Sequence, residues 1–184
     1  MNNPTTFDQG YPQMLAGVTE EALQAFRASR LPANPSALPL ILGGSQNTDD
    51  IVRFLRGNGL SANSYITQEN FPLAVCAAQT TVEIEIVDPG RVFDFDECET
   101  ILTKTGLLVP NYEHALHFAY QYGTATTSKK KPFIVFPHEP WQDPGGDRCV
   151  LCVCRDPDGR GLGLGSPDGR FLDDCVLAGV RPRT

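Results

Sequence analysis

The sequence predicts an α+β protein whose N-terminal two-thirds are mainly helical, with one or two strands. This part packs on a C-terminal antiparallel β-meander or on a small barrel-like sheet. Three observations predict this class. Apolar residues recur with helical spacing in several segments up to about residue 124, and after it they alternate or form short runs. Two near-identical turn sequences, DPDGR and SPDGR, separate the last runs.

Composition divides the chain into three parts. Residues 1–37 are rich in Asn, Pro and Thr and are predicted to be a flexible arm with one short helix over residues 19–30. Residues 38–124 form the acidic, mainly helical α+β part, and residues 125–184 form the meander. A chain of 184 residues is long enough for one well-buried core. We therefore expect the second and third parts to form one compact domain.

The acidic part begins with a predicted strand at residues 40–42 and a helix over residues 48–57, which carries two aspartates in its first turn. Residues 60–80 are ambiguous between a helix and a buried strand, and we expect a helix. Residues 81–87, TVEIEIV, alternate charged and apolar side chains. This alternation predicts a half-exposed strand.

Two further helices are expected before the meander. The first covers residues 94–106, begins with several acids and ends at a glycine. The second covers residues 111–123. Its apolar residues recur at helical spacing and predict one inward face, made of Tyr112, Ala115, Leu116, Ala119 and Tyr122.

The meander is predicted from four apolar segments that follow a basic loop at residues 129–131. These segments are 132–136, 148–155, 160–165 and 170–180. The segment RGLGLG offers few side chains for packing. We expect it to lie at an edge or to let another backbone approach closely.

The charge pattern excludes several kinds of partner. The formal net charge is −7, and residues 1–128 alone carry 6 basic and 14 acidic side chains. Such a chain repels phosphates, so nucleic acid is not an expected ligand. No stretch is apolar enough for a membrane span and the start lacks an export pattern, so we expect a cytoplasmic protein without membrane contact. The six cysteines are then expected to be reduced thiols.

A structural zinc module is one alternative for the cysteines. Cys149, Cys152 and Cys154 have ligand-like spacing, and Cys175 with His138 could complete four ligands. However, side chains alternate along a strand, which places Cys149 on one face and the other two on the opposite face. Packing of small buried cysteines in the core is the competing interpretation.

A divalent metal site is the second alternative. His114 and His117 are three residues apart and Glu113 is four before His117, so one side of the predicted helix can carry all three. With an acid from residues 94–99 they would suit a metal-dependent hydrolase. A solvated helix face explains the same residues without a metal.

The candidate binding residues lie in the FPHEPW segment and in the acidic run. His138 and Glu139 stand between two prolines, so this segment is expected to leave its strand rigidly and to present both residues and Trp141 outward. Asp94 and Asp96 are the candidate binding residues of the acidic part.

The function predicted from these observations is that of a non-enzymatic interaction module. We expect an adaptor or inhibitor whose acidic surface docks on a protein partner with a basic surface. No assembled catalytic set is visible, and no cofactor is expected. Under the two alternatives, the hydrolase and the structural module, zinc or another divalent metal would bind.

Overall fold

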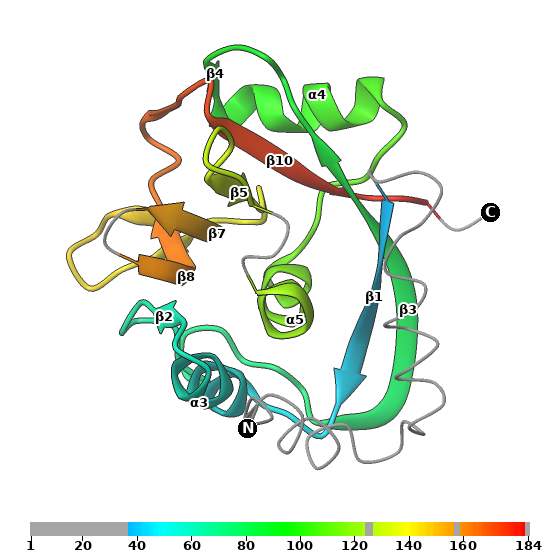
Figure 1. Cartoon of the computed structure of the whole chain (residues 1–184), viewed down its shortest axis with the longest axis vertical. Helices are drawn as coiled ribbons and strands as arrows, with labels where there is room; N and C mark the ends of the chain where they lie inside the picture. Colours follow the sequence, from blue (N-terminus) through cyan, green and yellow to red (C-terminus); the bar gives the residue numbers. More distant parts are fainter. Residues whose placement is uncertain (1–36, 124–126, 157–158, 183–184) are drawn as a thin grey trace, which may run out of the picture.

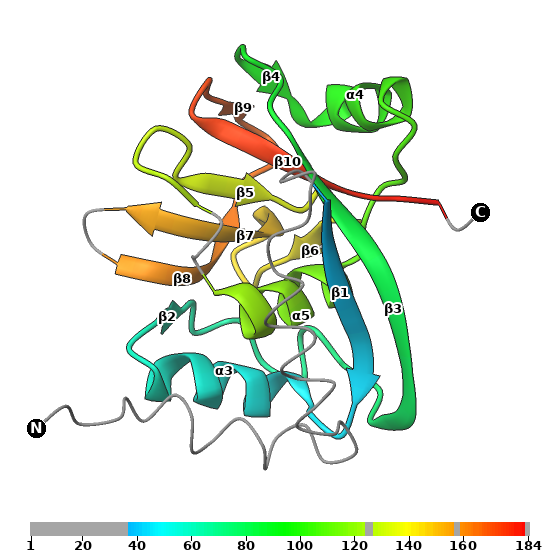
Figure 2. The same ribbon diagram turned by 45° about the vertical axis from the view of Figure 1, so that its right-hand side comes forward.

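One curled β-sheet wrapped around a central helix dominates the structure (Figures 1 and 2). The computed structural model describes residues 37–123, 127–156 and 159–182. The arm helix predicted for residues 19–30 therefore lies outside the described residues. The predicted flexibility of the arm does too.

The strands of the sheet follow the order β1-β3-β10-β5-β7-β8-β2, and β6 pairs with β7 outside this path. Two of the pairings, β10 with β5 and β2 with β8, are parallel, and the others are antiparallel. A separate pair is formed by β4 and β9. The strands are β1 (Ala37–Gly44), β2 (Ser61–Ala62), β3 (Cys76–Val87), β4 (Phe93–Asp94), β5 (Phe133–Val135), β6 (Trp141–Gln142), β7 (Arg148–Asp156), β8 (Gly159–Gly165), β9 (Arg170–Phe171) and β10 (Cys175–Val180).

The predicted fold class, a helical N-terminal two-thirds packed on a meander, is wrong. The described helices are short: α3 (Thr48–Gly57), α4 (Cys98–Lys104) and α5 (Tyr112–Tyr122), with a 3-10 turn η1 (Phe95–Glu97) before α4. Residues 60–80, expected to be helical, are mostly loop and end in the first half of β3. Pairing with β1 decides this conformation, because the local pattern of small residues favours neither state strongly.

The C-terminal strands do not form a simple antiparallel meander either. β7 and β8 make the expected hairpin, but β9 leaves to pair with β4, and β10 inserts between β3 and β5. All six residues of β10 are buried. Val176 and Ala178 face the core around α5, whereas Cys175 and Leu177 face a second core that includes Leu102 of α4. A strand buried on both faces is stable only in the middle of a sheet.

The predicted strand over residues 81–87 is confirmed as the second half of β3, and the helices over 48–57 and 111–123 are confirmed as α3 and α5. The inward face predicted for α5 is too narrow, because every residue from Ala115 to Tyr122 is buried. The sheet surrounds the helix, so its polar side also lacks solvent. None of the described helices is both long and apolar enough to cross a membrane.

β1 pairs with β3 along one edge, and side chains of α5 form hydrogen bonds with its other edge. The Ile41 backbone N–H donates to the Gln121 amide oxygen at 3.0 Å, and the Gln121 amide nitrogen donates to the Ile41 carbonyl at 2.6 Å. The Tyr122 hydroxyl donates to the carbonyl of Pro39. The central helix thus satisfies backbone groups that an edge strand would otherwise leave to water or to another chain.

Replacing Gln121 with leucine is expected to lower the free energy of unfolding by about 1–3 kcal/mol, because it removes both hydrogen bonds of Ile41 in a water-poor region. Urea unfolding followed by circular dichroism measures the loss. Gln79→Leu is the matched control, since Gln79 is an exposed residue of β3. Equal stability of the two variants would contradict the edge-covering contact.

Candidate binding pocket

A pocket of about 310 Å³ lies between the acidic run and the loop that joins β5 to β6. Its size falls at the lower end of the range for ligand pockets in proteins. Its walls are Phe95, Asp96, Cys98 and Glu99 from η1 and α4, Val109 from the loop before α5, and residues 137–140. Segments about 40 residues apart in the sequence therefore form one concavity.

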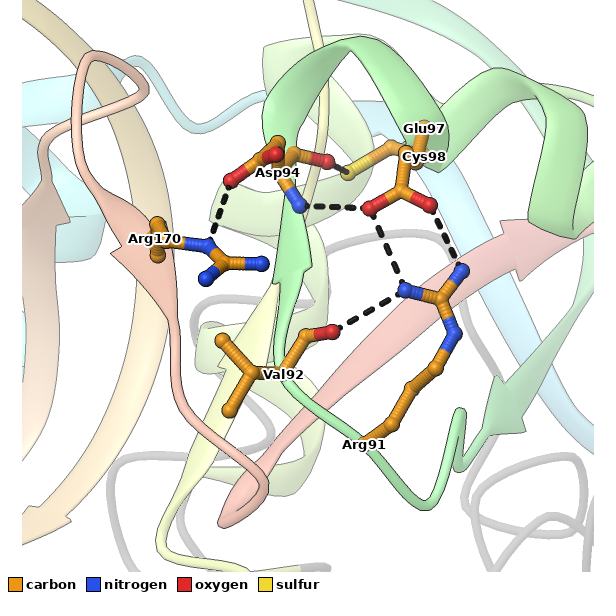
Figure 3. Close-up of polar contacts among 6 residues, drawn as sticks. All are labelled: Arg91, Val92, Asp94, Glu97, Cys98 and Arg170. Carbon is orange, nitrogen blue, oxygen red and sulfur yellow. Dashed lines mark hydrogen bonds and ion pairs between the residues drawn. The ribbon is translucent and has the colours of Figure 1, made fainter.

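Two ion pairs hold the acidic wall of the pocket in place (Figure 3). The Arg91 guanidinium donates to both carboxylate oxygens of Glu97, at 2.7 and 3.2 Å. Glu97 in turn accepts from the Asp94 backbone N–H at 2.9 Å, and the Asp94 carboxylate accepts from Arg170 at 3.0 Å. The hydrogen bond from Arg91, followed by that from Asp94, lowers the pKa of Glu97 to about 2. Glu97 and Asp94 are thus ion-paired anchors of η1.

The opposite wall is anchored by His138, which is 2 % exposed. Its Nε2 accepts from the Leu151 backbone N–H at 2.8 Å, and its Nδ1 lies 2.6 Å from the Glu139 carbonyl oxygen. These partners assign the neutral tautomer with the proton on Nδ1, which donates to that carbonyl. Burial lowers the pKa of His138. The imidazole therefore ties the 137–140 loop to β7.

Cys98 lines the pocket but is chemically inert. Burial, followed by the charge of Glu97, raises the pKa of its thiol to about 12. Its Sγ lies 3.7 Å from the Asp94 carbonyl oxygen, to which it donates. A thiol with such a pKa supplies no thiolate near neutral pH, and the fully bonded imidazole of His138 supplies no base. This pair therefore cannot act as a Cys–His nucleophile.

Three carboxylates of the pocket are uncompensated. Those of Asp96, Glu99 and Glu139 form no hydrogen bond and no ion pair within the described parts of the chain. They differ in this from Asp94 and Glu97, which belong to the same acidic run. The remaining walls, formed by Phe95, Val109 and the two prolines, are mainly apolar. The site therefore combines a concentrated negative charge with apolar contact area.

The structure brings together three of the five predicted binding residues. Asp96, His138 and Glu139 line the pocket, although His138 faces the interior and not the outside. Asp94 lies beside the pocket and is paired with Arg170. Trp141 is partly buried outside the lining, where its ring packs on Phe71 and Tyr65 at 5.4 and 5.9 Å between centroids.

The residues predicted to bind metal lie on α5. Glu113 is in the first turn, and Nδ1 of His114 lies 3.1 Å from the backbone nitrogen of Asn111, the residue that caps the helix. His117 is 4 % exposed, and burial lowers the pKa of both histidines to about 4. Within residues 37–123, 127–156 and 159–182, no three His, Cys, Asp or Glu side chains are arranged to hold a metal ion. The metal sites remain predictions that elemental analysis can test.

Sequence reasoning did not assign Phe95 or Val109 to a site, and it considered Glu99 only as one of the acids of residues 94–99 that could join a metal site. Glu99 follows Asp96 by three residues, which is the spacing of neighbours on one helix face, so it could have been found from the acidic run. Val109 had no such signal. Its place depends on how the loop after α4 returns along β10, where Leu108 pairs with Val180.

Comparison of the chain with protein-family models, with curated proteins and with solved structures finds no match.

Proposed function

We propose that this protein is a non-enzymatic interaction module, an adaptor or inhibitor, that docks on a basic surface of a protein partner. The pocket described above is the centre of the docking surface. One observation carries the proposal: the carboxylates of Asp96, Glu99 and Glu139 surround a concave site and form no ion pair within the described residues. A partner's cations can supply that counter-charge.

The contrast within the acidic run supports this assignment. Arg91 and Arg170 neutralise Glu97 and Asp94, so these acids stabilise the fold itself. The pocket carboxylates form no such pair with the part of the chain that the structure describes, and like charges around one cavity repel each other. A negative potential focused in a concave site attracts basic partners and speeds their association.

Binding fits the site better than catalysis does. Cys98 and His138 are the lining residues that could form a Cys–His nucleophile, and both are committed to the fold by burial or by backbone hydrogen bonds. The apolar part of the walls, which Phe95, Val109 and the two prolines form, suits contact with a side chain.

The basic residues of the chain also favour a protein partner over nucleic acid. Lys131 in the basic loop donates to the Asp88 carboxylate at 2.7 Å and to the Asp173 carbonyl at 2.6 Å. Arg181 pairs with Glu85 at 2.8 Å. These contacts remove part of the positive patch that a phosphate backbone would need.

The proposal is tested with a partner that has been captured from cells, identified and purified again. Calorimetry of the 1:1 mixture at 50 and 300 mM NaCl is expected to show an affinity that falls by about tenfold or more, as for contacts dominated by exposed charges. The triple variant Asp96→Asn, Glu99→Gln, Glu139→Gln is expected to bind about tenfold more weakly at low salt.

The control for this experiment removes three negative charges elsewhere. Glu69, Asp147 and Asp173 are exposed, and their carboxylates form no bond within the described parts of the chain. Their Gln or Asn variant should retain most of the affinity. Salt-independent binding that both triple variants preserve would refute an acidic docking surface.

A further inference from the structure

We infer that the pocket receives one arginine side chain of the partner, with the guanidinium between the carboxylates and the aliphatic stem on the apolar wall. This inference rests on the proposed function and specifies its occupant. Four properties of the pocket carry it: its volume, its walls, the distribution of its charges and the rigidity of its supports.

The volume and the walls select a single long side chain. A cavity of about 310 Å³ is too small for a helix, whose diameter with side chains is about 10–12 Å. Phe95, Val109, Pro137 and Pro140 offer apolar surface along the cavity. Arginine and lysine bury their methylene stems on such surface while the charged end stays with polar groups.

The distribution of the charges favours a guanidinium over a metal ion. Asp96 belongs to η1, Glu99 to α4 and Glu139 to the loop on the other side of the pocket. They do not form a group that could hold a metal ion. A guanidinium carries five donors in a fixed plane and can address carboxylates on different sides, whereas an ammonium is a compact point charge.

The ring of Phe95 already contacts a guanidinium within the chain. The Arg148 side chain lies over it, 6.0 Å from the ring centroid, and is itself paired with Asp168 at 3.0 Å. An aromatic ring attracts cations through its faces. Arg148 thus already occupies one face of this ring, and Asp168 balances its charge.

The supports of the pocket are in place before any ligand arrives. The Arg91–Glu97 and Asp94–Arg170 pairs hold η1 (Figure 3). His138 holds the facing loop through two backbone hydrogen bonds. A preformed site saves the entropy of ordering its walls on binding. The wall residue Val109 is 40 % exposed, and its neighbour in the sequence, Leu108, is 55 % exposed. An apolar residue next to the inserted arginine can pack there.

The test uses the full chain labelled with ¹⁵N and three capped hexapeptides: hexa-arginine, hexa-lysine and hexa-citrulline. Citrulline has nearly the shape of arginine without its charge. In 50 mM NaCl, hexa-arginine is expected to shift the amide signals of residues 95–99, Val109 and Glu139. Its affinity should exceed that of hexa-lysine at least threefold and that of hexa-citrulline at least tenfold.

Two matched variants localise the binding. Glu99→Gln with Glu139→Gln is expected to weaken hexa-arginine at least fivefold. Glu69→Gln with Asp173→Asn removes the same charge from exposed positions and should leave the affinity within twofold. Unchanged dispersion of the amide spectrum shows that both variants are folded.

The other outcomes separate this inference from the proposed function. Shifts spread over the acidic surface, with equal weakening by both variants, overturn the arginine pocket but leave a diffuse acidic docking surface. Equal affinity for hexa-arginine and hexa-lysine overturns the guanidinium assignment. Equally tight binding of N-acetyl-arginine amide, which carries one positive charge, would overturn the partner side chain as occupant and indicate a small-molecule site. Failure of both cationic peptides to bind at low salt counts against the inference and the proposed function together.

Discussion

Replacing Gly161 with alanine is expected to lower the free energy of unfolding by about 3 kcal/mol or more. A β-carbon at this position would lie 1.8 Å from the carbonyl oxygen of Ser61 and 2.6 Å from its carbonyl carbon. These are backbone atoms of β2, which runs parallel to β8 with Ser61 opposite Gly161. No side-chain rotation can relieve the overlap, so the two strands must separate.

The loss of stability would extend beyond the β2–β8 pair. The Asn63 backbone N–H donates to the Leu162 carbonyl at 3.0 Å, and β2 also packs on α3. Separation of the strands would therefore loosen α3 from the sheet. Urea unfolding followed by circular dichroism measures the change.

Gly57→Ala is the matched control. A β-carbon at Gly57, at the end of α3, would meet no atom within 4 Å. Alanine there should leave stability unchanged or raise it slightly, because alanine loses less entropy than glycine in a helix. If Gly161→Ala matched this control, the close approach of β2 and β8 would be refuted.

Acidification is the second large effect, and we expect the protein to lose stability between about pH 6.5 and pH 4. Burial lowers the pKa of all three histidines, and those of His114 and His117 fall to about 4. The unfolded chain, with ordinary histidine pKa values near 6.5, binds more protons than the folded chain in this window. The contribution of the neutral histidines to the free energy of unfolding is therefore fully present above pH 6.5, and it decreases as the pH falls through the window.

For His117 alone, the linkage between pH 7 and pH 5 amounts to about 2 kcal/mol. The carboxylates change the stability at lower pH than the histidines do. Asp88 and Glu97 have lowered pKa values because Lys131 and Arg91 bind them, so their contributions are lost only below about pH 4.5. The interval from pH 6.5 to 5 thus reports the histidines.

Urea unfolding at half-unit pH steps tests this expectation. His117→Gln removes one titrating group, so the slope of stability against pH between 6.5 and 5 should decrease. A fold whose stability is constant over this interval would contradict the lowered pKa values of the histidines.

The sequence alone was sufficient to predict the ends of several elements. The helices α3 and α5 begin after Asn47 and Asn111, each of which caps its helix through a reciprocal capping box. Such signals act within three or four residues and are visible in any local window. The same holds for the alternation in the second half of β3.

The close approach of another backbone to the glycine-rich strand was also predicted correctly. RGLGLG indicated an edge position or a close backbone approach, and β8 receives the backbone of Ser61 at Gly161. The signal was the run of glycines, which have no side chains that would keep another backbone away. Which backbone approaches, and from which part of the chain, was not predictable from the segment.

The pocket contains residues that the sequence predicted correctly and residues that it did not. Asp96 and Glu139 were predicted binding residues because acids and a rigid proline-flanked loop are visible in the sequence. His138 was assigned to the outside, yet the Leu151 N–H and the Glu139 carbonyl hold it inside. The sequence does not show which acids receive an arginine partner, because Arg170 reaches Asp94 across 76 residues.

The sequence by itself determined the acidity of the chain, the caps of its helices, the alternation of β3 and the residue types at the pocket. Only the tertiary structure decided that β10 lies between β3 and β5 and that α5 is surrounded by the sheet. It also decided that three carboxylates around one cavity have no ion-pair partner within the described residues. The physical reason is the range of the interactions. Caps and alternation depend on neighbours a few residues away, whereas strand order, burial and charge compensation depend on groups that only folding brings together.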